Sequence, residues 1–125
     1  MLAKFTYQRA ESIPETLQAA SAPAAHILAG GTDLLGCLRD GVFSANRVVS
    51  ISGMQELKDI KPRTGGGFHL GALATVAEIA GHAELRKAYP VLTEAALSAA
   101  SPQLRNQGTL GGQSLPAPAV LVFPR

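Results

Sequence analysis

The sequence predicts an α/β fold in its first half, followed by an α+β arrangement. Short segments rich in β-branched residues alternate with helix start signals between residues 5 and 51, which is the order of small α/β units. A glycine-rich stretch at residues 64–67 separates two further strand-like segments and is typical of an antiparallel hairpin. Alanine-rich segments that begin with capping residues come next and indicate helices.

The chain opens with a predicted strand and helix. Residues 5–9 are strand-like, and Ser12-Ile-Pro-Glu15 has the form of a capping box with proline at an early helical position. A serine hydroxyl and a glutamate three residues later can satisfy free N–H groups in the first helical turn. We therefore expect a helix from about Ile13 to Ala20.

A strand, glycine turn and helix follow within about twenty residues. Residues 24–28 predict a short buried strand that Gly30-Gly31 closes. Thr32 or Asp33 is expected to cap the next helix, toward Asp40, and this helix carries Leu34, Leu35 and Leu38. Residues 47–51 then predict a third strand in the α/β part.

The second half begins with the hairpin, which we expect to join residues 58–63 to residues 67–73. Thr75-Val-Ala-Glu78 repeats the capping-box pattern and predicts a short helix. Pro90 is expected to start another helix, and both helices should cover a sheet. The residues predicted on or near one face of the later helix are Val91, Leu92, Ala95, Ala96 and Ala99. From Ser101 onward we expect a loop.

Composition limits the classes of function. The formal net charge is +2 and comes from scattered residues, so nucleic-acid binding is not indicated. The single cysteine, Cys37, cannot form an internal disulfide or a CxxC metal site, fits a reducing compartment, and is most simply a buried packing residue. The three histidines, which lack metal-ligand spacing, are expected to be packing or surface residues. We expect no membrane span and no signal peptide.

The first candidate site is the glycine turn Ala29-Gly30-Gly31-Thr32-Asp33. Consecutive N–H groups in such a turn can point the same way, and the start of the following helix adds partial positive charge, so the turn can hold a phosphate without a cationic side chain. Glycine lets the backbone approach the anion, and the Thr32 hydroxyl can donate a further hydrogen bond. By itself the pattern is more often a plain turn, and it matches neither a Rossmann fingerprint nor a P-loop.

The second candidate site, Thr109-Leu110-Gly111-Gly112, has a similar composition about eighty residues later. Two such turns could hold the two phosphates of a dinucleotide from both sides. Arg105, just before this turn, could bind a sugar or phosphate, although a structural role at a helix end is at least as good an interpretation.

Four blocks together resemble the FAD-binding domain of molybdopterin dehydrogenases, the flavin subunit or domain of the xanthine dehydrogenase, aldehyde oxidoreductase and carbon monoxide dehydrogenase group. The blocks occur in the order known for that family and are spread over most of the chain up to Gly112. They are Leu28-Ala-Gly-Gly-Thr-Asp-Leu34, Gly71-Ala-Leu-Ala-Thr75, Pro90-Val-Leu-Thr-Glu-Ala-Ala96 and Ser101-Pro-Gln-Leu-Arg-Asn-Gln-Gly-Thr-Leu-Gly-Gly112.

The resemblance implies the amino-terminal part of a vanillyl-alcohol-oxidase-type FAD-binding fold. Residues 1–55 would form a small α/β subdomain and residues 56–112 the start of a larger α+β subdomain. The cofactor-binding residues implied are Ala29, Gly30, Gly31, Thr32, Asp33, Thr109, Leu110, Gly111 and Gly112, with no catalytic side chain and no metal ligand. No protein acid or base is needed because the flavin carries the redox chemistry.

The resemblance also implies partners: an iron-sulfur subunit and a molybdopterin-binding subunit of a molybdenum hydroxylase. Electrons would pass from the iron-sulfur clusters through FAD to an acceptor. A cytoplasmic location is expected, or a periplasmic one if an exported partner carries the chain. Two alternatives stay open: a nucleotide-diphosphate-binding or interaction protein without redox activity, and a non-functional gene remnant.

The last residues depart from the family pattern. The family continues Gly-Gly-Asn-Leu, whereas here Gly112 is followed by Gln113 and an apolar, proline-containing segment. One inserted base before the Asn codon could produce this segment, so we interpret residues 113–125 as an out-of-frame or disordered tail of a truncated fragment. An ordinary apolar terminal strand or a deliberately shortened chain are the alternatives. Nucleotide reads without such a base, relative to a sibling gene, would refute the frame-shift.

Overall fold

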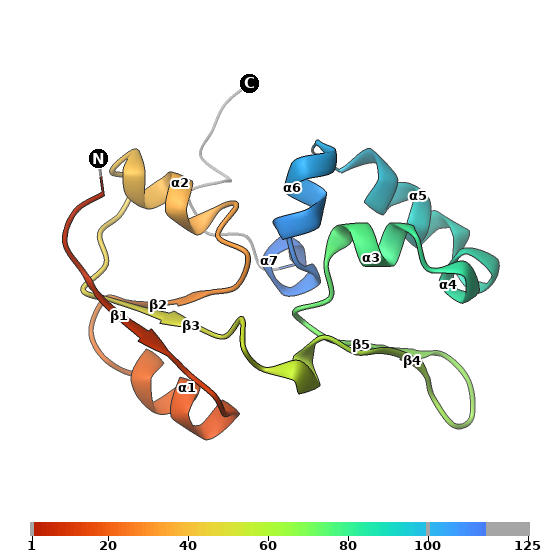
Figure 1. Cartoon of the computed structure of the whole chain (residues 1–125), viewed down its shortest axis with the longest axis horizontal. Helices are drawn as coiled ribbons and strands as arrows, with labels where there is room; N and C mark the ends of the chain where they lie inside the picture. Colours follow the sequence, from red (N-terminus) through yellow and green to blue (C-terminus); the bar gives the residue numbers. More distant parts are fainter. Residues whose placement is uncertain (1, 100, 115–125) are drawn as a thin grey trace. The chain divides into compact units, whose positions relative to one another are not determined.

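The computed structural model describes residues 2–99 and 101–114, which form two compact units (Figure 1). Unit 1 comprises residues 2–54, and unit 2 comprises residues 55–99 and 101–114.

Unit 1 is a small α/β unit. Its elements are β1 (Thr6–Arg9), α1 (Ile13–Ala20), β2 (Ala25–Leu28), α2 (Leu34–Arg39) and β3 (Arg47–Ser50). The strand order is β1-β3-β2, and β3 pairs in parallel with both neighbours. The predicted alternation of strands and helices is therefore confirmed for this part of the chain.

Helix α1 begins where the sequence predicts, with Ser12 as its capping residue. The Ser12 Oγ accepts a hydrogen bond from the Glu15 N–H at 3.2 Å. The Glu15 carboxylate, however, accepts from the Glu11 N–H at 3.0 Å and not from Ser12, so only half of the predicted capping box forms. The helix packs against β2 and β3, and its buried residues are Thr16 and Ala19.

The core of unit 1 is centred on β3, because this strand lies between the other two. Val48 and Val49 are fully buried and face opposite sides of the sheet. The expectation that β2 is a buried strand is wrong: β2 is an edge strand, and Ile27 is 48% exposed. One apolar cluster lies between the sheet and α2, and it consists of Leu38, Ala45 and Val48 with Phe5, Leu28, Leu34 and Phe43.

Unit 2 begins with a short 3-10 helix, Gln55–Leu57, and the predicted hairpin of β4 (Ile60–Pro62) and β5 (Phe68–Leu70). The hairpin turn contains three consecutive glycines with positive φ, Gly65 to Gly67. Five helices follow: α3 (Val76–Ala80), α4 (Ala83–Ala88), α5 (Pro90–Ser98), α6 (Pro102–Gln107) and α7 (Leu110–Ser114).

The helices of unit 2 start at capping side chains. Thr75 and Glu78 form the complete predicted capping box of α3, with the Glu78 carboxylate 2.8 Å from the Thr75 nitrogen. Helix α4, which the sequence analysis missed, begins at His82, whose Nδ1 accepts from the Leu85 N–H at 3.3 Å. A histidine ring nitrogen thus takes the place of the usual serine or aspartate oxygen.

Helices α3 and α5 pack together over the hairpin, as predicted. The buried residues Ala74, Val76, Ile79, Ala80, Leu85 and Ala96 contact the partly buried hairpin residues Ile60, Phe68 and Leu70. The predicted inward face of α5 needs correction, because Val91 is 77% exposed and Ala95 is also exposed. Thr93 is buried in their place and donates its hydroxyl to the Pro90 carbonyl.

The region from Ser101 onward is helical, so the expectation of a loop is wrong. The Ser101 Oγ accepts from the Leu104 N–H at 3.3 Å, and Pro102 occupies the first turn of α6. These are the same signals that mark the start of α1. Gln113 and Ser114, predicted to belong to the tail, are the last residues of α7. The rest of the predicted tail, residues 115–125, lies outside the described residues.

Candidate anion-binding loops

The first glycine loop connects β2 to α2 in unit 1. It leaves the sheet at the carboxyl end of β2, and the last ladder hydrogen bond runs from the Ile51 N–H to the Leu28 carbonyl at 3.0 Å. Leu28 and Leu34, on either side of the loop, are both anchored in the apolar cluster beneath α2. In open α/β sheets, ligands bind at the carboxyl ends of the strands, so the loop lies at the appropriate edge.

Free N–H groups are the main chemical feature of this loop. Within residues 2–99 and 101–114, the four consecutive N–H groups from Ala29 to Thr32 donate to no other atom of the chain. Ala29, Gly30 and Gly31 are only partly exposed. A partly buried N–H group without an acceptor is unfavourable unless water or a ligand supplies one. The loop therefore has the donors that an anion requires.

Gly31 has a conformation that favours glycine. Its φ is +79°, and a Cβ at this position would lie 2.9 Å from Leu35 Cδ1 and 3.3 Å from Leu28 Cδ1. The Gly31 carbonyl also accepts the Leu35 N–H at 3.3 Å, at the start of α2. The loop shape thus depends on the absence of a side chain here.

Asp33 occupies the N-cap position of α2, one of the two positions predicted, but its side chain makes no capping hydrogen bond. Its Oδ1 instead lies 3.7 Å from the Cys37 Sγ, one turn further along. Thr32 is exposed, which leaves its hydroxyl accessible to a ligand.

Cys37 is buried, as predicted. Burial, followed by the charge of Asp33 and its hydrogen bond to the thiol, raises the pKa of Cys37 above its ordinary value. A raised thiol pKa keeps the group protonated and unreactive near neutral pH. Cys37 is thus suited to packing and not to nucleophilic or metal chemistry.

The second glycine cluster is built differently, because two of its N–H groups are occupied. Leu110 donates to the Ala74 carbonyl and Gly111 donates to the Ala72 carbonyl, both at 2.9 Å. A Cβ on Gly111 would lie 3.1 Å from the Ala72 oxygen. The Gly112 N–H reaches only the Thr109 Oγ1, at 3.3 Å. Leu110 and Gly111 therefore fasten this turn to the segment before α3.

The two predicted loops belong to different units. Ala29 to Asp33 lie in unit 1, and Thr109 to Gly112 lie in unit 2. Their meeting around one diphosphate stays a prediction.

Arg105 has a structural role. Its Nη1 donates to the Leu97 carbonyl at 2.8 Å and to the Ala99 carbonyl at 3.2 Å. It therefore satisfies carbonyl groups at the end of α5, which is the second of the two interpretations the sequence left open.

Other polar residues offer little catalytic chemistry. His26 packs against the Phe43 ring, and His82 serves as a helix cap. No group of three or more His, Cys, Asp or Glu side chains that could hold a metal ion occurs among the described residues. None of the helices in that part of the chain has the length and apolarity to span a bilayer.

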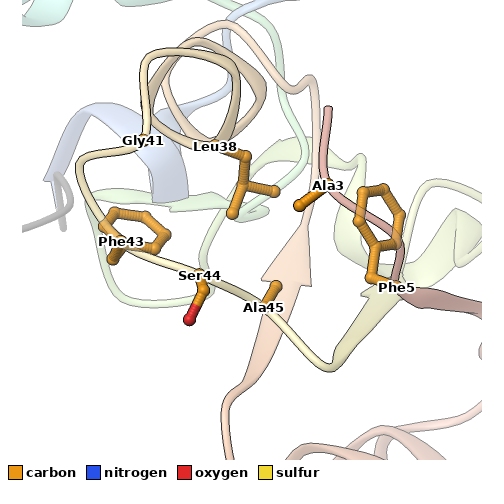
Figure 2. Close-up of a pocket in the computed structure, with 7 residues that line it drawn as sticks. All are labelled: Ala3, Phe5, Leu38, Gly41, Phe43, Ser44 and Ala45. Atoms are coloured by element: carbon orange, nitrogen blue, oxygen red, sulfur yellow. The ribbon is translucent and has the colours of Figure 1, made fainter. Parts of the chain in front are cut away.

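An apolar pocket of about 310 Å³ lies in unit 1 (Figure 2). It is lined by Ala3, Phe5, Leu38, Gly41, Phe43, Ser44 and Ala45. Several of these residues precede β1 or β3, and the others follow or end α2, so the pocket lies at the amino-terminal edge of the sheet. It is thus at the opposite edge from the glycine loop and does not form part of the candidate anion site.

Residues at the loop's own edge were not singled out in the sequence. Parallel pairing brings Arg9, at the end of β1, into one register row with Ser50 and Leu28. The signal available in the sequence was a cationic residue at the end of a strand in a predicted parallel sheet.

A glycine loop with free N–H groups at the carboxyl edge of a small parallel sheet is typical of nucleotide-binding proteins, and comparison identifies the family. Residues 3–116 match the FAD-binding domain in molybdopterin dehydrogenase. The chain belongs to this family, and the predicted fold class, the amino-terminal part of this FAD-binding fold, is confirmed.

Individual relatives agree with this assignment. The chain is 37% identical over 112 residues to the aldehyde oxidoreductase FAD-binding subunit PaoB of Escherichia coli K12, covering 89% of this chain and 35% of that protein. It is 38% identical over 86 residues to the nicotinate dehydrogenase FAD-subunit of Eubacterium barkeri, covering 69% of this chain and 29% of that protein.

Solved structures show the same similarity. Carbon monoxide dehydrogenase from Oligotropha carboxidovorans matches with a TM-score of 0.85 and 27% identity, over 91% of this chain and 40% of that chain. Quinoline 2-oxidoreductase from Pseudomonas putida 86 matches with a TM-score of 0.83 and 30% identity, over 90% and 39%. The chain thus spans well under half the length of these relatives.

Proposed function

We propose that this chain serves as the FAD-binding part of a molybdenum hydroxylase flavin subunit and that Ala29 to Asp33 hold the FAD diphosphate. The observation that carries the proposal is the run of four N–H groups, from Ala29 to Thr32, that have no acceptor within the described residues. Family membership supplies the identity of the ligand, since residues 3–116 match an FAD-binding domain.

The residues present fit a diphosphate. Four backbone donors in succession can bind its oxygens, Gly31 keeps the surface open to close approach, and the exposed Thr32 hydroxyl adds a donor. Helix α2 has only six residues, so its dipole adds little and the loop amides themselves must supply most of the binding. When bound, FAD supplies the redox chemistry, and the protein supplies position and electrostatics.

The second loop contributes in another way. The N–H groups of Leu110 and Gly111 are bonded within unit 2, so we assign these residues to shaping the turn that faces the cofactor. Gly112 is exposed inside α7, where glycine costs about 1 kcal/mol relative to alanine. An exposed helical glycine is explained if the cofactor approaches its backbone closely, with Thr109 holding the turn in shape.

We further propose that units 1 and 2 correspond to the small subdomain and the start of the larger subdomain. The partners proposed are an iron-sulfur subunit and a molybdopterin-binding subunit, from which electrons pass to a final acceptor. The names of the relatives support this, since they are FAD subunits of aldehyde oxidoreductase and xanthine dehydrogenase and a carbon monoxide dehydrogenase medium chain. This chain's part is to hold and orient the cofactor.

The test is a binding titration of the full chain with FAD, ADP and riboflavin. Calorimetry measures the binding of all three ligands, and flavin fluorescence measures the binding of FAD and riboflavin. We expect FAD and ADP to bind through the shared diphosphate and riboflavin to bind far more weakly. Gly31→Ala should weaken binding of both phosphate ligands, whereas Gly36→Ala, which meets no atom within 4 Å, should not. Equal binding of riboflavin and FAD, or no loss in Gly31→Ala, would contradict the assignment of the loop.

Two results would favour other functions. Tighter binding of ADP than of FAD would favour a nucleotide-diphosphate-binding protein without a flavin role. A chain that shows no cooperative unfolding and binds none of the three ligands would favour a non-functional remnant.

A further inference from the structure

Arg9 lies at the same edge of the sheet as the glycine loop. It is the last residue of β1 and shares a register row with Ser50 of β3 and Leu28 of β2. In parallel strands, residues of one row project to the same face of the sheet. The side chains of Arg9 and Leu28 therefore share a face, and the loop begins directly after Leu28.

The guanidinium of Arg9 lies at the turn that follows the central strand. A Cβ added to Gly53 would lie 2.7 Å from Arg9 Nη2 and 2.9 Å from Nε, so the guanidinium lies directly against Gly53. Gly53 belongs to the turn that follows β3, and β3 is the direct neighbour of β2. The Arg9 side chain thus crosses from the end of its own strand to the end of the central strand.

This guanidinium has no partner within residues 2–99 and 101–114: no hydrogen bond or ion pair joins it to another described residue. Other arginines are engaged in the protein. Arg39 pairs with Asp40, and Arg86 donates to the Ala80 carbonyl. An exposed guanidinium at the same sheet edge as a loop of free N–H groups is suited to bidentate contact with phosphate oxygens.

The charges at this edge also favour such a role. The diphosphate of FAD is anionic, and backbone amides attract an anion only through partial charges. A full positive charge at the same edge would add to that attraction, and Arg9 is the basic residue that ends a strand of this sheet at that edge.

We propose that Arg9 is a second anion-binding group of the cofactor site, whose guanidinium binds the diphosphate held by residues 29–32. The proposal rests on the proposed FAD function. It assigns a binding residue, so its test is affinity and not activity.

Arg9→Gln and Arg47→Gln are the matched variants. Both remove one positive charge from the sheet, but Arg47 begins β3 and lies at the opposite edge. For Arg9→Gln we expect about tenfold weaker binding of FAD and of ADP, which corresponds to losing one charge-assisted contact, and a smaller salt dependence of binding. Arg47→Gln should stay within about twofold of the parent chain, because a charge at the opposite edge of the sheet is distant from the loop and screened.

The outcomes separate this proposal from the proposed function. If the parent chain binds FAD and ADP but Arg9→Gln binds them as Arg47→Gln does, the role of Arg9 is refuted and the role of the loop stands. If the parent chain binds neither ligand, both are refuted. Thermal unfolding of each variant checks folding. Should Arg9→Gln unfold, Arg9→Lys replaces it, and unchanged affinity in that variant refutes bidentate binding by the guanidinium.

Discussion

Thr75 and Thr109 form an isolated antiparallel bridge in unit 2. Two hydrogen bonds flank it, from the Val76 N–H to the Gly108 carbonyl and from the Leu110 N–H to the Ala74 carbonyl, both at 2.9 Å. The bridge joins two sequence blocks that the family resemblance recognised separately. The second glycine cluster is therefore held against the start of α3, and this explains why its amides are less available than those of the first loop.

Substitution by alanine should have different effects on the free energy of unfolding at Gly111 and at Gly112. A Cβ on Gly111 would lie 3.1 Å from the Ala72 oxygen and 3.2 Å from the Ala72 Cβ, so Gly111→Ala should lower the free energy of unfolding by about 1–3 kcal/mol. Gly112→Ala meets only the Thr109 Oγ1, at 3.4 Å, and should leave stability unchanged or raise it by up to about 1 kcal/mol. Urea denaturation measures both. Equal destabilisation by the two variants would contradict the packing described.

Ala24 has a left-handed backbone, with φ at +52°. This conformation costs an alanine roughly 1 kcal/mol, and glycine adopts it without strain. Ala24→Gly should therefore raise the free energy of unfolding despite glycine's greater freedom in the unfolded chain. Ala83→Gly, in the first turn of α4, is the control and should lower stability by about 0.5–1 kcal/mol. Destabilisation by both changes would show that Ala24 is not strained.

The capping box of α3 should contribute measurably to stability. Thr75→Ala removes the acceptor of the Glu78 N–H, which lies 3.1 Å from the Thr75 Oγ1, and should lower the free energy of unfolding by about 1 kcal/mol. Thr75→Ser keeps the hydroxyl and should retain most of that stability. Chemical denaturation compares the two. A serine variant as unstable as the alanine variant would assign the effect to the lost methyl group.

Cys37 should make stability depend on pH in the alkaline range. Burial raises the pKa of this thiol in the folded protein above its ordinary value of 9.0, so the folded state holds the proton more tightly than the unfolded chain. The contribution to stability is complete below the unfolded pKa and is lost as the pH rises through the folded pKa. As the pH rises above the unfolded value of 9.0, the parent chain should therefore lose more stability than Cys37→Ala does. If the parent chain and Cys37→Ala lose the same stability over this range, the pKa of Cys37 is not raised in the folded protein.

Local signals predicted much of unit 1 and the hairpin, because each element there depends on residues close in sequence. Ser12 marked the start of α1 correctly, and the glycines at 65–67 marked the hairpin turn. The same serine-proline signal at Ser101 was overlooked because the following residues are polar and α6 buries none of them. That β3 and not β2 is central could not be predicted, since strand order follows from long-range pairing.

In the candidate site, too, some features follow from local sequence and others from long-range contacts. Composition located both glycine clusters, but which N–H groups are free depends on contacts between distant segments. Gly71 illustrates this, because a Cβ there would collide with the Leu57 carbonyl group. Its place in a family block reflects close backbone packing and not ligand binding. The position of Arg9 at the same sheet edge as the loop likewise follows from sheet register and not from any local motif.

The most direct measurement is an amide-resolved NMR titration of the isotope-labelled chain with ADP, using riboflavin as the ligand without phosphate. The N–H signals from Ala29 to Thr32 should shift most with ADP and stay nearly unchanged with riboflavin, because those four groups lack acceptors in the described protein. If the largest ADP shifts fall elsewhere while these four signals stay in place, the glycine loop after β2 does not hold the cofactor's diphosphate.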